Sequence, residues 1–233
     1  MTHRITLEPL FVLHTRPYSN TSLIADCFSM RHGRFTALAR SARGLKSRYR
    51  GKLQPFVPML ASWSGTREMK NLGDIELHGA PYALDRHALV CGFYLNELLM
   101  RLLQRDDPFP NLFNMYQMTL NALEKGQDIQ IALRCFEKNL LSELGYGLSL
   151  DTEALEGRPI NAEAYYQYIP DRGFVLSDAC NESVYLFSGQ CLLALHTETF
   201  SDDSVLHDIK RLMRLVLRHY LGNKPLRSRD LMI

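Results

Sequence analysis

The hydrophobic periodicity of the chain changes near residue 80. Before that point, apolar residues occur in short runs or alternate with polar residues, and turn-forming residues separate the runs. Several short strands with closely spaced turns favour a small antiparallel barrel. After residue 82, leucines recur at helical spacing. The sequence therefore predicts an α+β protein, with a strand-rich domain at 1–80 and a mainly α-helical domain at 81–233.

The expected elements follow from these patterns. We expect five strands, over 10–13, 22–30, 35–40, 53–63 and 74–78. Pro55 and Pro58 indicate that the fourth is an edge or bulged strand, because proline cannot donate a hydrogen bond to a sheet. A β-hairpin is expected at 165–176, and helices at 82–104, 111–124, 129–144, 188–195 and 201–221. Asp128, Ser188 and Ser201 are the expected N-caps.

Acidic residues are absent between Cys27 and Arg67, although nine Lys or Arg occur there. Residues 1–80 hold twelve bases and five acids, a net charge of +7, whereas residues 81–233 carry a net charge of −5. A basic part joined to a faintly acidic part indicates one surface for a polyanion. Phosphate contacts supply affinity because each neutralised phosphate releases condensed counterions.

Residues 40–52 are rich in bases and poor in apolar side chains, so we expect a mobile basic loop between the third and fourth strands. The alternative is a solvated run of charges with no ligand. Tyr49 either stacks on a nucleobase or packs on the barrel. The candidate phosphate-binding residues are Arg34, Arg40, Arg43, Lys46, Arg48, Arg50 and Lys52.

Motifs for catalysis, metal binding and export are absent from the sequence. The five scattered cysteines favour reduced thiols in a cytoplasmic protein. No signal segment and no membrane span are expected. The chain lacks zinc-ligand spacing, a phosphate-binding glycine loop and a nucleophile elbow, which favours a non-enzyme without metal or cofactor. Two acidic pairs, Asp106–Asp107 and Asp202–Asp203, fit helix ends better than a Mg²⁺ site.

Five segments together resemble the bacterial RecO family of recombination mediators. They are LFVLHTRPYSNTSLI (10–24), the ARSARG…RGKLQPF stretch (39–56), YLNELL (94–99), LGYG (144–147) and LGNKPLRSRDL (221–231). The resemblance implies an N-terminal OB-fold followed by an α-helical domain. It also implies a DNA-repair protein that binds single- and double-stranded DNA, anneals strands coated by single-strand-binding protein and helps load RecA with RecR. Such a protein is cytoplasmic and associates with the nucleoid during repair.

The resemblance also concerns two particular sites. The family binds the acidic C-terminal tail of single-strand-binding protein in its helical domain, and Arg134 at the rim of an apolar groove is our candidate for that contact. Many members carry a four-cysteine zinc module. Here its positions fall on Glu153, Glu156, Ser177 and Cys180, so segment 150–180 is a degenerate module and the chain belongs to the zinc-free branch.

Two other functions remain open from the residues alone. An RNA-binding OB-fold protein would use the same basic loop. A metal-dependent nuclease would use Asp202 and Asp203 as metal-binding carboxylates. The last helix adds a basic stripe of Lys210, Arg211, Arg214 and Arg218, which is either a solvated face or a second phosphate-binding surface.

Overall fold

The computed structural model describes residues 4–66, 68–177, 185–200, 202–222 and 224–228. The chain divides into two compact units, one holding Met1–Gly126 with Pro225–Ile233 and the other holding Gln127–Lys224. The chain thus leaves the first unit after residue 126 and returns to it near its end. No described helix is long and apolar enough to cross a membrane.

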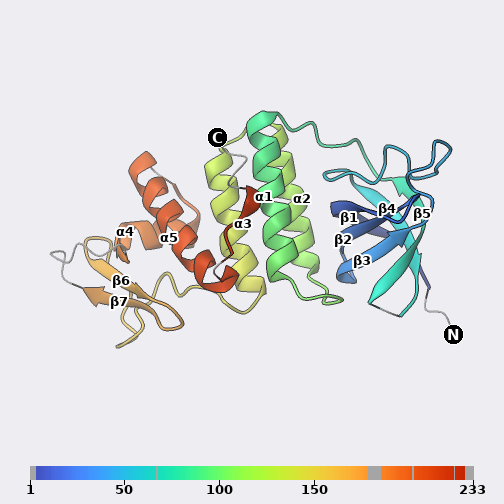
Figure 1. The fold of residues 1–233 in the computed structure, drawn as a ribbon. Coiled ribbons are helices and arrows are strands. Elements are labelled where there is room, and N and C mark those ends of the chain that lie inside the picture. Colours follow the sequence, from blue (N-terminus) through green and yellow to red (C-terminus); the bar gives the residue numbers. More distant parts are fainter. Residues whose placement is uncertain (1–3, 67, 178–184, 201, 223, 229–233) are drawn as a thin grey trace. The chain divides into compact units, whose positions relative to one another are not determined.

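The first unit begins with a closed five-stranded barrel (Figure 1). Its strands are β1 (Arg4–Tyr18), β2 (Ser22–Ser29), β3 (Gly33–Ala39), β4 (Met59–Ser64) and β5 (Met69–Leu77). They close in the order β1-β2-β3-β5-β4, and of the described strand pairs in the barrel the β3–β5 pair alone is parallel. This arrangement confirms the predicted OB-like barrel and the α+β class. Its core is lined by inward-facing side chains such as Phe35 and Trp63, whose ring centroids lie 4.5 Å apart.

Two strands differ from the sequence prediction. β1 is much longer than residues 10–13, because register shifts near Ile5 and Val12 let one bent strand pair with both β4 and β2. β4 begins at Met59 and not at residue 53. The residues before it are irregular, since Phe56 has a positive φ of 64° and prolines at 55 and 58 interrupt the ladder.

Two helices complete the first unit: α1 (Arg86–Leu102) and α2 (Pro110–Glu124). Asp85 caps α1 by accepting a hydrogen bond from the backbone of Ala88, so the helix begins later than predicted. The helices are joined to the barrel by a buried polar chain. The hydroxyl of Tyr116 donates to Asn96 Oδ1 at 2.6 Å, and Asn96 Nδ2 donates to the carbonyl oxygen of Leu13 at 2.9 Å.

The returning C-terminal segment is held on α1 by one carboxylate. Glu97 accepts hydrogen bonds from the backbone amides of Arg227 and Ser228 at 3.0 and 2.9 Å, and from the Ser228 hydroxyl at 2.7 Å. Arg101, one turn further along, donates to the carbonyl oxygen of Pro225 at 3.1 Å. Leu226, which lies between Pro225 and Arg227 in the sequence, is buried. The segment is therefore fixed at both its polar and its apolar residues.

The second unit contains helices and a small antiparallel sheet of order β7-β6-β8 (Figure 1). Its elements are α3 (Ile129–Glu143), β6 (Tyr165–Ile169), β7 (Gly173–Ser177), β8 (Leu186–Ser188), α4 (Gly189–Thr197) and α5 (Asp203–Leu221). The predicted hairpin and the caps Asp128 and Ser188 are confirmed. The N-cap of α5 is Asp202, which accepts from the backbone of Val205. The expected cap, Ser201, lies outside the described residues.

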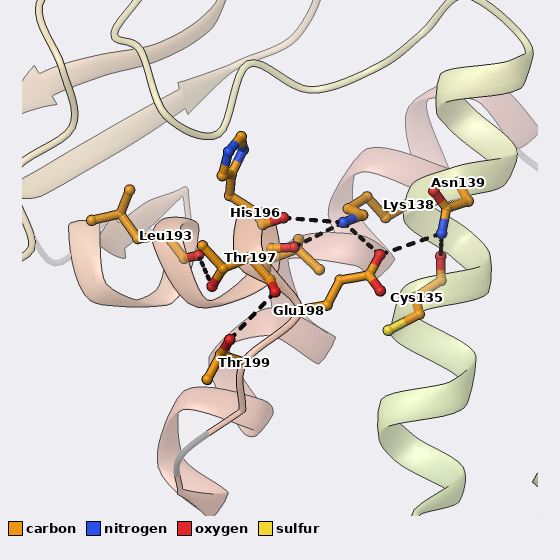
Figure 2. Close-up of polar contacts among 9 residues, drawn as sticks. Cys135, Lys138, Asn139, Leu193, His196, Thr197, Glu198 and Thr199 are labelled. Atoms are coloured by element: carbon orange, nitrogen blue, oxygen red, sulfur yellow. Dashed lines mark hydrogen bonds and ion pairs between the residues drawn. The ribbon is translucent and has the colours of Figure 1, made fainter.

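A polar cluster joins α3 to the end of α4 (Figure 2). Lys138 on α3 donates to the carbonyl oxygens of Leu195 and His196 at 3.2 and 3.3 Å and pairs with Glu198 at 2.6 Å. A cation at these carbonyls suits the negative end of the α4 dipole. The half-buried thiol of Cys135 lies in the same cluster, where burial and then the Glu198 charge raise its pKa to about 12.

Candidate nucleic-acid interface

Residues 40–52 form a chain of turns between β3 and β4, which is the position predicted for the basic loop. Backbone hydrogen bonds join residue 44 to 41, 47 to 44, 50 to 47 and 52 to 49, at 3.0–3.3 Å. The segment brings together six of the seven candidate phosphate-binding residues: Arg40, Arg43, Lys46, Arg48, Arg50 and Lys52. We call residues 40–52 the basic segment.

Tyr49 anchors the basic segment to the barrel. Its ring is 3% exposed and belongs to the barrel core. Its hydroxyl donates to the carbonyl oxygens of Leu72 and Gly73, both at 2.9 Å, and accepts from Arg48 Nη2 at 2.9 Å. A ring held in this way is not exposed for stacking on a base. Of the two sequence interpretations of Tyr49, packing on the barrel is confirmed.

The charges of the basic segment are largely not neutralised. Arg48 pairs with Asp74 at 2.8 Å, and this is its one ion pair within the described residues. Arg43 and Arg50 donate to neutral carbonyl oxygens, those of Ser19 at 3.4 Å and Leu45 at 3.2 Å. These bonds position the guanidinium groups and leave their charge available. Bases tied to neutral acceptors can still bind phosphate, because each arginine has five N–H donors.

Arg34 is placed apart from the other six candidates. It lies at the start of β3, whereas Arg40 follows the end of that strand, about 20 Å away at 3.3 Å per residue. Its Nε and Nη2 donate to the carbonyl oxygen of Leu103 at 3.1 and 3.0 Å. Partial burial, and then the nearby charge of Arg105, lowers the pKa of Arg34. The structure therefore gives this residue a contact to α1 that the charge pattern did not suggest.

One carboxylate of each acidic pair has a structural partner. Asp202 caps α5, and Asp203 lies in the first turn of that helix, as the sequence predicted. Asp106 pairs with Lys70 at 3.1 Å. Within the described ranges, no group of three or more His, Cys, Asp or Glu is placed to hold a metal ion.

The segment at the zinc-module positions is organised by a carboxylate. Glu153 accepts hydrogen bonds from the backbone amides of Leu155 and Glu156, and Glu156 pairs with Arg158. The amide of Leu155, and then that of Glu156, lowers the pKa of Glu153, so the group acts as an anion. Ser177 ends β7, and Cys180 lies outside the described residues. A turn whose backbone amides bind the Glu153 carboxylate thus stands where the zinc module of the family has its first cysteine pair.

Arg134 is buried on α3, which differs from the predicted position at the rim of a groove. The residue is 4% exposed, and its Nη2 donates to Glu137 Oε1 at 2.7 Å. Arg134 Nε has no hydrogen-bond partner among the described residues. The charge of Arg134 is therefore paired with Glu137 on the same helix, inside the protein and not at its surface.

The basic stripe of α5 separates into two parts. Arg211 donates to the carbonyl oxygen of Leu186 at 2.7 Å and lies over the ring of Phe187 at 4.3 Å, so it holds β8. Arg214 and Arg218 are exposed on the same face, four residues apart. Lys210 and Arg211 are half-buried, so Arg214 and Arg218 are the exposed members of the stripe.

Sequence reasoning missed one exposed apolar residue within the basic segment. Leu45 is 84% exposed, more than any other large apolar residue among those described. A single exposed leucine is common on protein surfaces. The available signal was an apolar side chain between Arg43 and Lys46, in a stretch otherwise made of small and charged residues.

Comparison with known proteins places both parts of the chain in one family. The family model for "Recombination protein O N terminal" matches residues 4–80, and that for "Recombination protein O C terminal" matches residues 83–230. The DNA repair protein RecO of Coxiella burnetii is 56% identical over 234 residues, covering 100% of both chains. That of Methylococcus capsulatus is 43% identical over 228 residues, covering 98% of this chain and 93% of the relative.

A third relative extends the agreement. The DNA repair protein RecO of Aromatoleum aromaticum is 44% identical over 226 residues, covering 97% of this chain and 94% of its own. These matches follow the chain through the barrel and the helices alike. The resemblance seen in the sequence motifs is confirmed, and the chain belongs to the RecO family.

Proposed function

We propose that this protein is a recombination mediator in DNA repair that binds the phosphate backbone of DNA through its basic segment. The observation that supports this most is the placement of six bases on one series of turns, with Asp74 as the single acidic partner among the described residues. Family membership supports the role in DNA repair, since the relatives are named DNA repair proteins. Contacts to phosphate position a strand without reading its sequence.

The wider activity is part of the same proposal. The protein binds single- and double-stranded DNA, anneals complementary strands coated by single-strand-binding protein and helps load RecA together with RecR. It performs no turnover and needs no cofactor or metal in this role. Sequence-independent phosphate binding suits such work, because a mediator acts wherever single strands are exposed.

The direct test replaces three bases of the segment at once. Arg40→Ala/Arg43→Ala/Lys46→Ala should weaken binding of a labelled single strand by about tenfold or more at 50 mM salt. The matched control, Arg86→Ala/Lys125→Ala/Arg172→Ala, removes the same charge from exposed positions elsewhere. Equal affinity of the two triple variants would remove the basic segment from the interface. Tighter binding of RNA than of DNA of equal length would favour the RNA-binding alternative.

A second contact is proposed for Arg134. Arg134 is 4% exposed, so the carboxylate of a tail peptide reaches its unused Nε donor only after the side chains that cover it move aside. Arg134→Ala is a poor test, because it leaves the Glu137 carboxylate buried without this partner. Arg134→Met/Glu137→Leu removes the pair together and keeps the packing. This variant should lose binding of the acidic tail peptide, and a peptide amidated at its C-terminus should bind neither protein. Undiminished binding to the variant would exclude Arg134.

A further inference from the structure

The basic segment carries a pocket beside its charges. The pocket has a volume of about 390 Å³, within the range of small-molecule sites. Its apolar lining includes Leu23 at the start of β2, Ala42 in the segment and Leu53 after it. Leu45, Arg43 and Arg50 line it as well. A pocket of mixed apolar and polar lining, bordered by two arginines, suits a ligand that is flat and apolar in one part and anionic in another.

Hydrogen bonds hold the residues of this pocket in place. The backbone amide of Arg43 donates to the carbonyl oxygen of Thr21 at 2.8 Å, which ties the segment to the β1–β2 turn. Arg50 Nη1 donates to the carbonyl oxygen of Leu45 at 3.2 Å, which closes the segment on itself. The buried Tyr49 ring is a further lining group. A ligand therefore meets a formed site, and little ordering is needed on binding.

The exposure of the Leu45 side chain is the feature of the basic segment that a ligand in the pocket would change most. Its side chain is 84% exposed, and burial of a leucine stabilises by about 1.5–3 kcal/mol relative to exposure. It borders the pocket together with the two arginines. A planar ring entering the pocket would cover this side chain, while phosphates on either side of the ring would reach Arg43 and Arg50.

We propose that this pocket receives one unstacked nucleobase of single-stranded DNA, with its neighbouring phosphates on Arg43 and Arg50. The inference rests on the proposed function and specifies the form of DNA that the site prefers. A paired base can enter only after it is unstacked and unpaired, which costs a few kcal/mol. The pocket therefore distinguishes single strands from duplex, although the phosphate contacts alone do not.

The test uses an oligonucleotide whose bases can be removed without loss of its phosphates. A thymidine 15-mer, a 15-mer of abasic deoxyribose phosphates and a duplex of the same length are each titrated against the full chain. The wild type should bind the thymidine strand at least fivefold more tightly than the abasic strand. Leu45→Ala, at an exposed position, should weaken binding of the thymidine strand about threefold. It should therefore reduce the ratio of the affinities for the thymidine and abasic strands. Its affinity for duplex should not change.

Each other outcome decides something different. Equal binding of the thymidine and abasic strands by wild type and variant overturns the base pocket, while the phosphate-binding function stands. If the wild-type protein binds none of the three oligonucleotides, the proposed function itself is contradicted. A uridine RNA strand that binds more tightly than the thymidine strand, with the same Leu45→Ala effect, assigns the pocket to RNA and overturns the DNA proposal.

Discussion

Arg34 holds the end of α1 on the barrel by donating two hydrogen bonds to the carbonyl oxygen of Leu103. Leu103 is the C-cap of that helix, where carbonyl groups lack helical partners. The amide of Asp106 returns a hydrogen bond to the carbonyl oxygen of Arg34 at 2.9 Å. Gly33 lies against the same segment, since a Cβ there would overlap the Asp107 carbonyl. The start of β3 thus fixes the end of α1 to the barrel through Gly33 and Arg34.

Arg34→Ala should lower the free energy of unfolding by about 1.5–3 kcal/mol. The substitution removes a cationic group that donates two hydrogen bonds to the carbonyl oxygen of Leu103. Chemical denaturation of the variant measures this. Arg40→Ala, at an exposed position beyond the other end of β3, should change it by less than about 0.5 kcal/mol. Normal stability with weakened DNA binding would instead place Arg34 in the DNA interface, as its charge predicts.

Tyr49→Phe should lower the free energy of unfolding by about 1–2 kcal/mol. The variant keeps the ring in the core but leaves the carbonyl oxygens of Leu72 and Gly73 without this donor. Thermal unfolding followed by circular dichroism gives the change. Tyr18→Phe, at an exposed tyrosine in the same unit, serves as the control and should be neutral. Unchanged stability of Tyr49→Phe would show that the hydroxyl does not anchor the basic segment to the barrel.

The C-terminal segment should detach in acid. Partial burial favours the neutral Glu97 carboxyl, but the bonds from Ser228 and Arg227 outweigh it and lower its pKa below the ordinary 4.5. A carboxylate with a depressed pKa stabilises the folded state above the ordinary value, and this contribution is lost as pH falls through the folded pKa. Glu97→Gln should therefore cost about 1–2 kcal/mol at pH 7 and progressively less below pH 4.5.

Denaturation curves between pH 7 and pH 3 measure that effect. Glu76→Gln is the matched control, because Glu76 is exposed in the same unit. A stability difference between Glu97→Gln and the wild type that is the same at pH 7 and pH 3 would show that the Glu97 carboxylate is not the titrating clamp.

Cys135 should react slowly with alkylating reagents at pH 8, since its pKa is raised to about 12 by burial and by Glu198. Two substitutions break the same Lys138–Glu198 ion pair with opposite electrostatic effects. Glu198→Gln removes a negative charge and should speed alkylation, whereas Lys138→Met removes a positive charge and should slow it. Site-resolved mass spectrometry measures both rates. Faster reaction in both variants would indicate loosened packing and not electrostatic control.

Local signals in the sequence predicted much of the fold. The caps Asp128 and Ser188 and the hairpin at 165–176 depend on neighbouring residues alone, and the structure confirms them. The contacts of Arg34 and Glu97 join residues 69 and about 130 positions apart, so no local pattern reveals them. The burial of Arg134 could not be predicted for the same reason. An arginine in a helical pattern is expected to be exposed unless the residues that pack around it in space are known.

The basic segment shows the same limit at the candidate site. A charge count located residues 40–52, and spacing along the chain placed them between two strands. The turns, the Tyr49 anchor and the pocket beside Leu45 depend on contacts with Thr21, Leu72 and Gly73, which lie outside the segment. Charge therefore indicated the candidate segment, and tertiary contacts determine its shape.

The salt dependence of single-strand binding tests the central claim most directly. The logarithm of affinity should fall linearly with the logarithm of salt concentration, by about 0.7 for each phosphate neutralised on a single strand. Removal of Arg40, Arg43 and Lys46 together should reduce this slope by about 2, whereas the Arg86/Lys125/Arg172 control should keep the wild-type slope. An unchanged slope in the Arg40/Arg43/Lys46 variant would show that DNA is bound elsewhere on the molecule.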